Sequence, residues 1–486
     1  MGTSASSGDS IIQSPAFADM LRVPGLGRLL RWRWGRLVFQ IPVLIIAILM
    51  IYDGLTGPQV APQNIATVTA WVHYRGLVIL ALLLVGNLFC MSCPFALPRT
   101  LARKLSIRGR RWPRALRNKW LAIGVLFIFF WLYEWLDLWA SPWLTAWLVV
   151  TYFVAAFALE AVFAESPFCK YVCPLGTFNF VNAGVSPTQV TARDPQVCLS
   201  CQGKECINGG AKTLGCGTEL FVPQVKSNMD CVLCLDCARA CPYDNVAWAI
   251  RPPAQELARG VWPRRWDLAF LALALAFTAI SNAFGMVPPV YALEETLAGW
   301  LNTRSEALVL LLIFGTANLL LPAALGLGAA WLSRRLSGRA DGDSLRVVFT
   351  RYAPAVVPLG FAVWLAHYAY HFATGALTIV PVFQSFLLDH GLALPITSPD
   401  WSLSAILPTH WLLPLQIGIV LAGFVGSLYI VGELARRAHP HPRTARVAAT
   451  PWLALFLALA VAAVYIFSLP MEMRGAPALL SLSGMQ

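Results

Sequence analysis

The chain has 486 residues, of which 58% are apolar and only 12% are charged. A soluble domain carries about 25% charged residues, so this composition excludes a wholly soluble protein and predicts a surface that contacts membrane lipid. The net charge of +12 does not indicate nucleic acid as a partner, because the basic residues form short clusters beside apolar stretches, as they do where they fix membrane topology.

Residues 1–36 are predicted to form a cytoplasmic N-terminal tail. The first 20 residues are rich in serine and contain no basic residue, so they lack the positively charged start of a signal peptide. We expect this stretch to be disordered rather than cleaved.

Apolar stretches of about 20 residues, the length that crosses a bilayer, predict nine transmembrane helices. They lie at 37–53, 75–95, 120–139, 143–163, 267–289, 305–333, 352–375, 409–432 and 449–469. The first four belong to a membrane module at 37–184, and the last five belong to a second module at 256–486. The predicted fold is therefore a mainly α-helical, polytopic membrane bundle.

The basic residues predict the orientation of this bundle. If the N-terminus is cytoplasmic, all of the 36 Lys and Arg residues fall in cytoplasmic segments except Arg75, Arg304 and Arg474. Cytoplasmic loops carry such an excess. We therefore expect a multi-pass protein of the bacterial inner membrane, with its N-terminus and every cysteine on the cytoplasmic side.

The twelve cysteines form four groups within one third of the chain. The groups are Cys90-x2-Cys93-Pro, Cys169-x3-Cys173-Pro, Cys198-x2-Cys201-x4-Cys206-x9-Cys216 and Cys231-x2-Cys234-x2-Cys237-x3-Cys241-Pro. Because the cytoplasm keeps thiols reduced, metal ligation is favoured over disulfides. Twelve thiolates suffice for three [4Fe–4S] clusters.

The last group is the run typical of bacterial ferredoxins, in which three thiolates hold one cluster and the fourth serves its neighbour. By analogy with two-cluster ferredoxins, one cluster is predicted on Cys198, Cys201, Cys206 and Cys241, and a second on Cys231, Cys234, Cys237 and Cys216. Residues 185–255 would then form a small cytoplasmic α+β domain of the ferredoxin type. The alternative is a zinc ribbon, because two Cys-x2-Cys pairs also suit zinc.

The two remaining pairs are related to each other. The segment 89–95 aligns with 168–175 if one residue is inserted, and each follows the second helix of a hairpin, which suggests an internal repeat. Two such hairpins side by side would bring together Cys90, Cys93, Cys169 and Cys173, where we predict a third [4Fe–4S] cluster. The alternative is two dithiol pairs that act as a redox relay or bind another soft metal.

The helical hairpins that end in Cys-x2/3-Cys-Pro, followed by eight ferredoxin-like cysteines, resemble the NapH/NosR/CcoG-type membrane polyferredoxins. The resemblance covers about residues 37–250. It implies electron transfer between the quinone pool and periplasmic reductases, or a role in metalloenzyme maturation. The chain departs from the family in its first pair, which has x2 where x3 is usual, in the lack of a large periplasmic flavin domain before the helices, and in its five extra helices.

Four histidines expected toward the outer face are candidates for a further cofactor: His73, His367, His371 and His410. His367 and His371 are four residues apart and share one helix face. A haem b could lie between one of them and His410 or His73. A quinol site with Tyr368 and Tyr370 is a second possibility, because a histidine can accept the released proton. The third is that these residues only anchor helix ends.

Together these patterns predict an electron-transfer subunit of a bacterial respiratory or related redox complex. It would pass electrons between quinone, or a partner redox subunit such as a cytochrome, and cytoplasmic-side clusters. Two other classes remain open. A maturation factor, which reduces a metal or assists cofactor assembly, would use the same cysteines, whereas a transporter or scaffold subunit would have its function in the last five helices and use the clusters as sensors. No hydrolytic motif is present.

Overall fold

The computed structural model describes residues 18–98, 110–163, 166–210, 213–338, 343–392, 395 and 398–471. Within these ranges eight helices are long and apolar enough to cross a membrane, which confirms a multi-pass helical protein. The remaining expected helix, at 120–139, is present as α7 (Trp120–Trp135). At 1.5 Å per residue it is about 24 Å long, shorter than a hydrocarbon core of about 30 Å.

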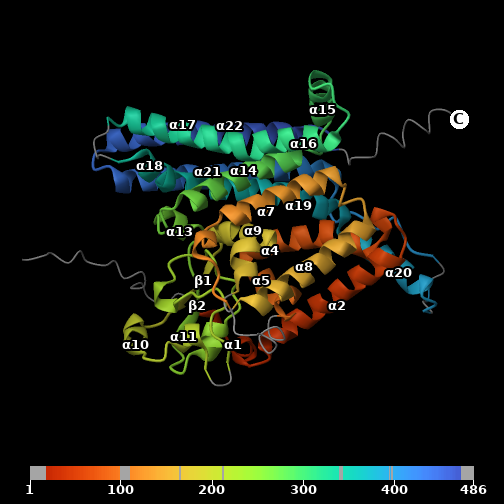
Figure 1. Cartoon of the computed structure of the whole chain (residues 1–486), viewed down its shortest axis with the longest axis horizontal. Coiled ribbons are helices and arrows are strands. Elements are labelled where there is room, and N and C mark those ends of the chain that lie inside the picture. The colour runs from red at the N-terminus through yellow and green to blue at the C-terminus, as the bar shows by residue number, and fades with distance from the viewer. Residues whose placement is uncertain are drawn as a thin grey trace, which may run out of the picture.

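The N-terminal membrane module consists of two long helices and a group of shorter elements. Its elements are α2 (Gly35–Thr56), α3 (Ile65–Thr67), the π-helical turn η3 (Val68–Tyr74), α4 (Arg75–Leu84), α5 (Leu88–Ser92), α7, α8 (Pro142–Val162) and α9 (Pro174–Asn182). Helix α2 packs along α8. These two helices lie side by side in Figure 1.

The second span lies earlier than its predicted range of 75–95, because it runs from Ile65 to Leu84. Its start is set by Asn64, whose Oδ1 accepts a hydrogen bond from the Ala66 N–H at 2.9 Å. The chain turns at Gly86, where φ is +110°, a backbone conformation that favours glycine. As a result, Arg75 lies buried inside the span, and Cys90 lies beyond its end.

The C-terminal module packs around one central helix. Its elements are α14 (Trp266–Phe284), α15 (Pro289–Trp300), α16 (Glu306–Gly315), α17 (Leu321–Leu336), α18 (Leu345–Tyr352), α19 (Val357–Gly375), α20 (Ile379–Asp389), α21 (Leu412–Ala438) and α22 (Pro442–Ser468). Helix α14 contacts α17, α19 and α22, and 83% of its apolar stretch is buried. Its many alanines allow this close approach of neighbouring helices.

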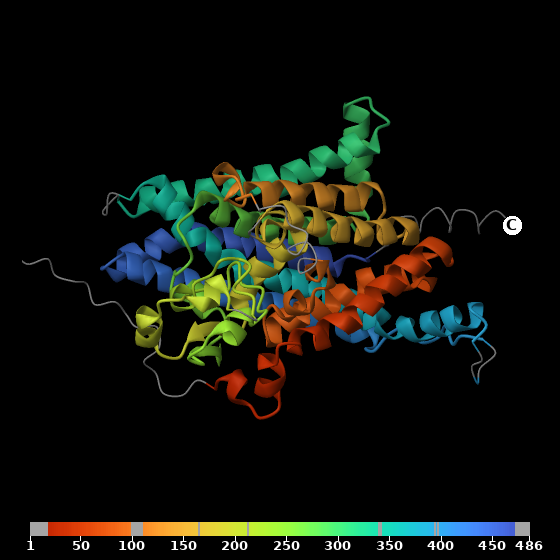
Figure 2. The same ribbon diagram turned by 60° about the horizontal axis from the view of Figure 1, so that its bottom comes forward.

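Several helix contacts join the C-terminal module to the N-terminal one, among them that of α16 with α7. Helix α19 packs against α4. Helix α20 lies beside α2, where the rings of Phe386 and Tyr52 are 6.2 Å apart, and Figures 1 and 2 show these two helices close together at the same end. The two modules therefore share an interface along their helices.

The cysteine-rich region lies at one side of the helical modules, at the lower left in Figure 1. Strands β1 (Thr188–Ala192) and β2 (Val246–Ile250) pair antiparallel, with Thr188 opposite Ile250. The short helices are α10 (Pro195–Ser200), α11 (Glu205–Asn208), α12 (Asp236–Ala240) and α13 (Gln255–Ala258). This two-stranded sheet and its helices form a small α+β unit in the described residues.

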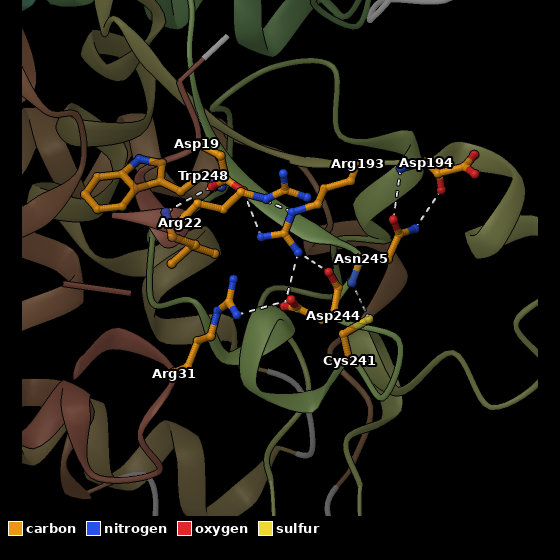
Figure 3. Close-up of polar contacts among 10 residues, drawn as sticks. Asp19, Arg22, Arg31, Arg193, Asp194, Cys241, Asp244, Asn245 and Trp248 are labelled. Atoms are coloured by element: carbon orange, nitrogen blue, oxygen red, sulfur yellow. Dashed lines mark hydrogen bonds and ion pairs between the residues drawn. The ribbon is translucent and has the colours of Figure 1, made fainter. Parts of the chain in front are cut away.

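Part of the predicted N-terminal tail is packed against this sheet. Helix α1 (Leu26–Arg31) follows a short turn that begins at Met20, and Leu21 and Leu30 are buried. The Asp19 carboxylate accepts hydrogen bonds from the Arg193 side chain at 2.7 and 3.0 Å and from the Trp248 backbone N–H at 3.1 Å (Figure 3). Residues 18–34 therefore extend the cysteine-rich unit, while residues 1–17 lie outside the described chain.

Candidate metal centres

Four of the predicted ligands line one cavity in the cysteine-rich unit. These are Cys198, Cys201, Cys206 and Cys241. Asn245 links two of them, because its Nδ2 donates to Cys198 Sγ at 3.2 Å and its backbone N–H donates to Cys241 Sγ at 3.4 Å. The Asn245 amide is itself held by the backbone of Asp194 at 2.6 and 2.9 Å, as Figure 3 shows.

A second cavity is lined by the cysteines of the two hairpins. These are Cys90, Cys93, Cys169 and Cys173. Asn179 Nδ2 donates to Cys90 Sγ at 3.3 Å, and the Gly176 N–H donates to Cys173 Sγ at 3.2 Å. Aromatic rings complete the wall of this cavity: Phe89, Phe95, Phe168 and Phe180. The structure thus brings the two pairs together in one cavity, whose wall also includes Arg36 and Glu160.

The third predicted set also gathers in space. Burial raises the pKa of Cys237, and three thiols lie close enough to it for their charges to raise the pKa further: Cys216, Cys231 and Cys234. The Leu220 N–H donates to Cys216 Sγ at 3.3 Å. Burial raises the pKa of Cys231 to about 12, so this sulfur is a neutral thiol at neutral pH when no metal is bound.

The backbone around the third set has an unusual conformation. Leu233 and Leu235 have φ values of +52° and +58°, a left-handed region that leucine rarely enters. The backbone N–H groups of Leu233 and Asp236 bond to the sulfurs of Cys231 and Cys234. Turns that point successive N–H groups inward form concave anion sites, and many iron–sulfur sites are of this kind.

These three sets fit an anionic cluster by their chemistry. Each set supplies four thiols, and N–H donors point at sulfurs in all three. Such donors stabilise negative charge on sulfur and tune a bound cluster. Among the residues that the structure describes, no three His, Cys, Asp or Glu side chains converge as they would on one metal ion.

Arg36, at the start of α2, lies between the second and third sets. Its side chain lines the hairpin cavity, and its Nε donates to the Met91 carbonyl at 2.9 Å. On its other side it forms an ion pair with Asp236 at 3.6 Å. Although burial raises the pKa of Asp236, Arg36 and Arg239 hold it below its usual value, so this carboxylate is ionised. The two cysteine sets are therefore neighbours joined by a buried charge network.

Lys119 makes a second link between the membrane module and the third set. Its Nζ donates to Asp230 Oδ1 at 2.5 Å and to the Lys170 carbonyl at 2.6 Å, and it is nearly fully buried. In the sequence, Lys119 and Arg36 were recognisable only as topology signals, and Asn179 and Asn245 were not identified as functional residues. The available signal was an asparagine shortly after two of the three Cys-Pro steps, Asn179 after Cys173-Pro174 and Asn245 after Cys241-Pro242.

The four candidate histidines do not form one group. His367 is fully buried, and its Nε2 lies 3.0 Å from His371 Nε2. Both ring nitrogens of His73 are engaged by backbone carbonyls, at 3.1 Å to Val68 and 2.8 Å to Ala376. His410 is exposed, with its ring against Trp411. The structure brings together His367 and His371 and places the other two in separate surroundings.

No family model, curated protein or solved structure matches this chain.

Proposed function

We propose that the protein is a membrane-bound iron–sulfur electron-transfer subunit of a bacterial redox complex. The observation that supports this most directly is the gathering of twelve cysteines into three sets of four, two of which each line a single cavity. When bound, [4Fe–4S] clusters would take up and release single electrons. We further propose that residues 185–255 are a ferredoxin-like domain and that the protein is related to the membrane polyferredoxins that it resembles.

The residues of the chain have separate tasks in this proposal. One cluster would be held by Cys198, Cys201, Cys206 and Cys241, a second by Cys216, Cys231, Cys234 and Cys237, and a third by Cys90, Cys93, Cys169 and Cys173. The asparagine and backbone N–H groups stabilise charge on sulfur, and the phenylalanines of the hairpin cavity exclude water. Hydrogen bonding and burial are the means by which a protein sets cluster potentials.

The proposed setting is the cytoplasmic face of the bacterial inner membrane, with quinone or a redox subunit as the partner. The basic residues support this orientation, because nearly all of them fall on the side of the cysteines if the N-terminus is cytoplasmic. The eight apolar helices support lipid contact.

Cysteine variants test the assignment of the sets. In protein purified without oxygen, Cys90→Ser and Cys234→Ser are each expected to lose about four irons, one cluster's content, and to remove one electron paramagnetic resonance signal of the reduced protein. Ser92→Ala is the matched control, since Ser92 lies between Cys90 and Cys93 and its hydroxyl donates to the Leu88 carbonyl at 3.1 Å. Equal iron content in all three variants would refute the assignment.

A further inference from the structure

We propose that His367, His371 and Met286 form a binding site for a soft monovalent metal ion, Cu(I). His367 Nε2 lies 3.0 Å from His371 Nε2 and 3.3 Å from Met286 Sδ. Donor atoms that are each about 2 Å from one ion stand about 3–4 Å apart. Two of the three donor pairs, both of which include His367, therefore already have the spacing that a shared ion requires.

The donor set narrows the choice of metal. Imidazole suits copper, zinc, iron and nickel, whereas a thioether favours soft ions and Cu(I) in particular. Two imidazoles and one thioether, with no carboxylate among the three donors, are a poor match for magnesium or calcium, which take oxygen ligands. Copper and zinc accept both donor types, and the charge of the surroundings distinguishes the monovalent Cu(I) from Zn²⁺.

Two different elements hold the donors in place. The histidines are four residues apart on α19, so both rings project from one helix face. Met286 comes from the turn directly after α14 and is 7% exposed. Because α14 and α19 pack closely, the three side chains are positioned by the core of the C-terminal module rather than by a surface loop.

The nearby charge favours an ion of low charge. The Arg75 guanidinium acts electrostatically on both histidines. It is held 4.6–5.2 Å from the ring centres of Trp71, Tyr133 and Tyr368, an arrangement that stabilises a buried cation. A fixed positive charge next to the site opposes a divalent ion about twice as strongly as a monovalent one.

The site is expected to exchange its ion. In metal sites a ligating histidine usually donates its second ring N–H to a partner, and losing that bond lowers affinity about 10–100-fold. His367 Nδ1 is buried without a hydrogen-bond partner among the described residues. We therefore infer a site that takes up and releases copper rather than one that retains it permanently.

The proposed copper site is independent of the cysteine centres. Its test compares copper binding by the wild type with copper binding by variants of the site. Full-length protein purified without oxygen in detergent is titrated with Cu(I) against a chromophoric Cu(I) chelator. The wild type is expected to hold one more Cu(I) per chain than Met286→Leu and His371→Ala, or to bind that ion at least tenfold more tightly. Copper on any free cysteine is the same in all three proteins and cancels.

His410→Ala is the control, because His410 is an exposed histidine away from the pair, and it should bind copper as the wild type does. Met286→Leu keeps the side-chain volume, so it carries the test if His371→Ala does not fold. Equal copper binding by the wild type and Met286→Leu would overturn the proposal. Displacement of the ion by an equal concentration of Zn²⁺ would overturn the assignment to a soft monovalent metal.

Discussion

At the scale of single residues, two asparagines connect the cysteine centres to the surrounding fold. Asn245 bonds two sulfurs of one set, and Asn179 bonds Cys90 from the helix that follows Cys173-Pro. A donor to sulfur stabilises the more negative, reduced state of a cluster, so it raises the reduction potential. These amides are therefore expected to set potentials without being ligands.

Replacing Asn179 by leucine should lower the potential of the hairpin-site cluster. One lost hydrogen bond is worth about 1–1.5 kcal/mol, which corresponds to about 40–60 mV for one electron. The measurement is a redox titration followed by electron paramagnetic resonance. Asn182→Leu is the control, because this amide lies on the same helix but donates to the Phe178 carbonyl at 3.0 Å. Equal shifts in both variants would contradict the role assigned to Asn179.

Replacing Arg36 by glutamine should lower potentials at both neighbouring centres. The substitution removes a positive charge that lies at the hairpin cavity and pairs with Asp236. A loss on the order of 50 mV is expected for a charge at this range in a partly buried setting. Arg36→Lys keeps the charge, and its potentials should stay closer to the wild type. If Arg36→Gln leaves both potentials unchanged, the arginine is only structural.

At the scale of elements, hydropathy located the helices but not all of their boundaries. The second span was predicted too late because apolar residues continue through Leu88 and Phe89, whereas the helix ends where Gly86 turns the chain. The two ferredoxin-type sets were predicted by analogy with two-cluster ferredoxins, and the structure gathers the members of one of them around a single cavity. The left-handed backbone conformations of Leu233 and Leu235 could not be predicted, because no residue propensity favours leucine in that conformation.

Gly86→Ala should destabilise the junction between α4 and the sheet. At φ +110° an added Cβ would lie 2.7 Å from Ser186 Oγ and 3.2 Å from Thr188 Oγ1. We expect a loss of about 1–3 kcal/mol in the free energy of unfolding, measured in detergent with increasing SDS. Gly124→Ala in α7 is the control, since its Cβ would meet nothing within 4 Å, and it should be neutral or stabilising. A Gly86→Ala protein as stable as the wild type would contradict the strain argument.

Glu256 anchors α13 between the sheet and the helical module. Its carboxylate pairs with Arg251 at 2.5 Å and accepts from the Trp262 indole at 2.6 Å and the Asn228 N–H at 2.8 Å. Breaking a fully buried pair costs about 3–5 kcal/mol.

Glu256→Gln should therefore unfold far more easily in the same SDS assay. Glu433→Gln removes more exposed pairs with Arg436 and Arg437 and is expected to cost about 1 kcal/mol or less. Similar losses for the two variants would show that the Glu256 network is not the anchor.

At the scale of the whole molecule, packed aromatic rings run between the cysteine-bearing module and the histidine pair. Phe178, next to the asparagine that bonds Cys90, lies 5.2 Å from Trp364. Trp364 lies 5.1 Å from Tyr368, which lies 5.6 Å from His367. The two modules are thus one packed body, and the metal site proposed on α19 is in contact with the same core that supports the hairpin cavity.

The sequence predicted the membrane bundle and the three cysteine sets but not the site on α19. His367 and His371 were recognisable from their spacing of four. Met286 is distant in sequence and chemically inconspicuous, so its position beside the pair depends on how α14 packs against α19. Long-range packing of this kind leaves no local pattern. For the same reason the neighbouring position of Arg36 and Asp236 was not predictable.

The central claim is that the three cysteine sets hold clusters. Its most direct test is the count of iron and acid-labile sulfide per chain in full-length protein purified without oxygen. The account predicts about twelve irons and twelve sulfides, the content of three [4Fe–4S] clusters. A colourless, iron-free protein that is folded and prepared under the same conditions would contradict it.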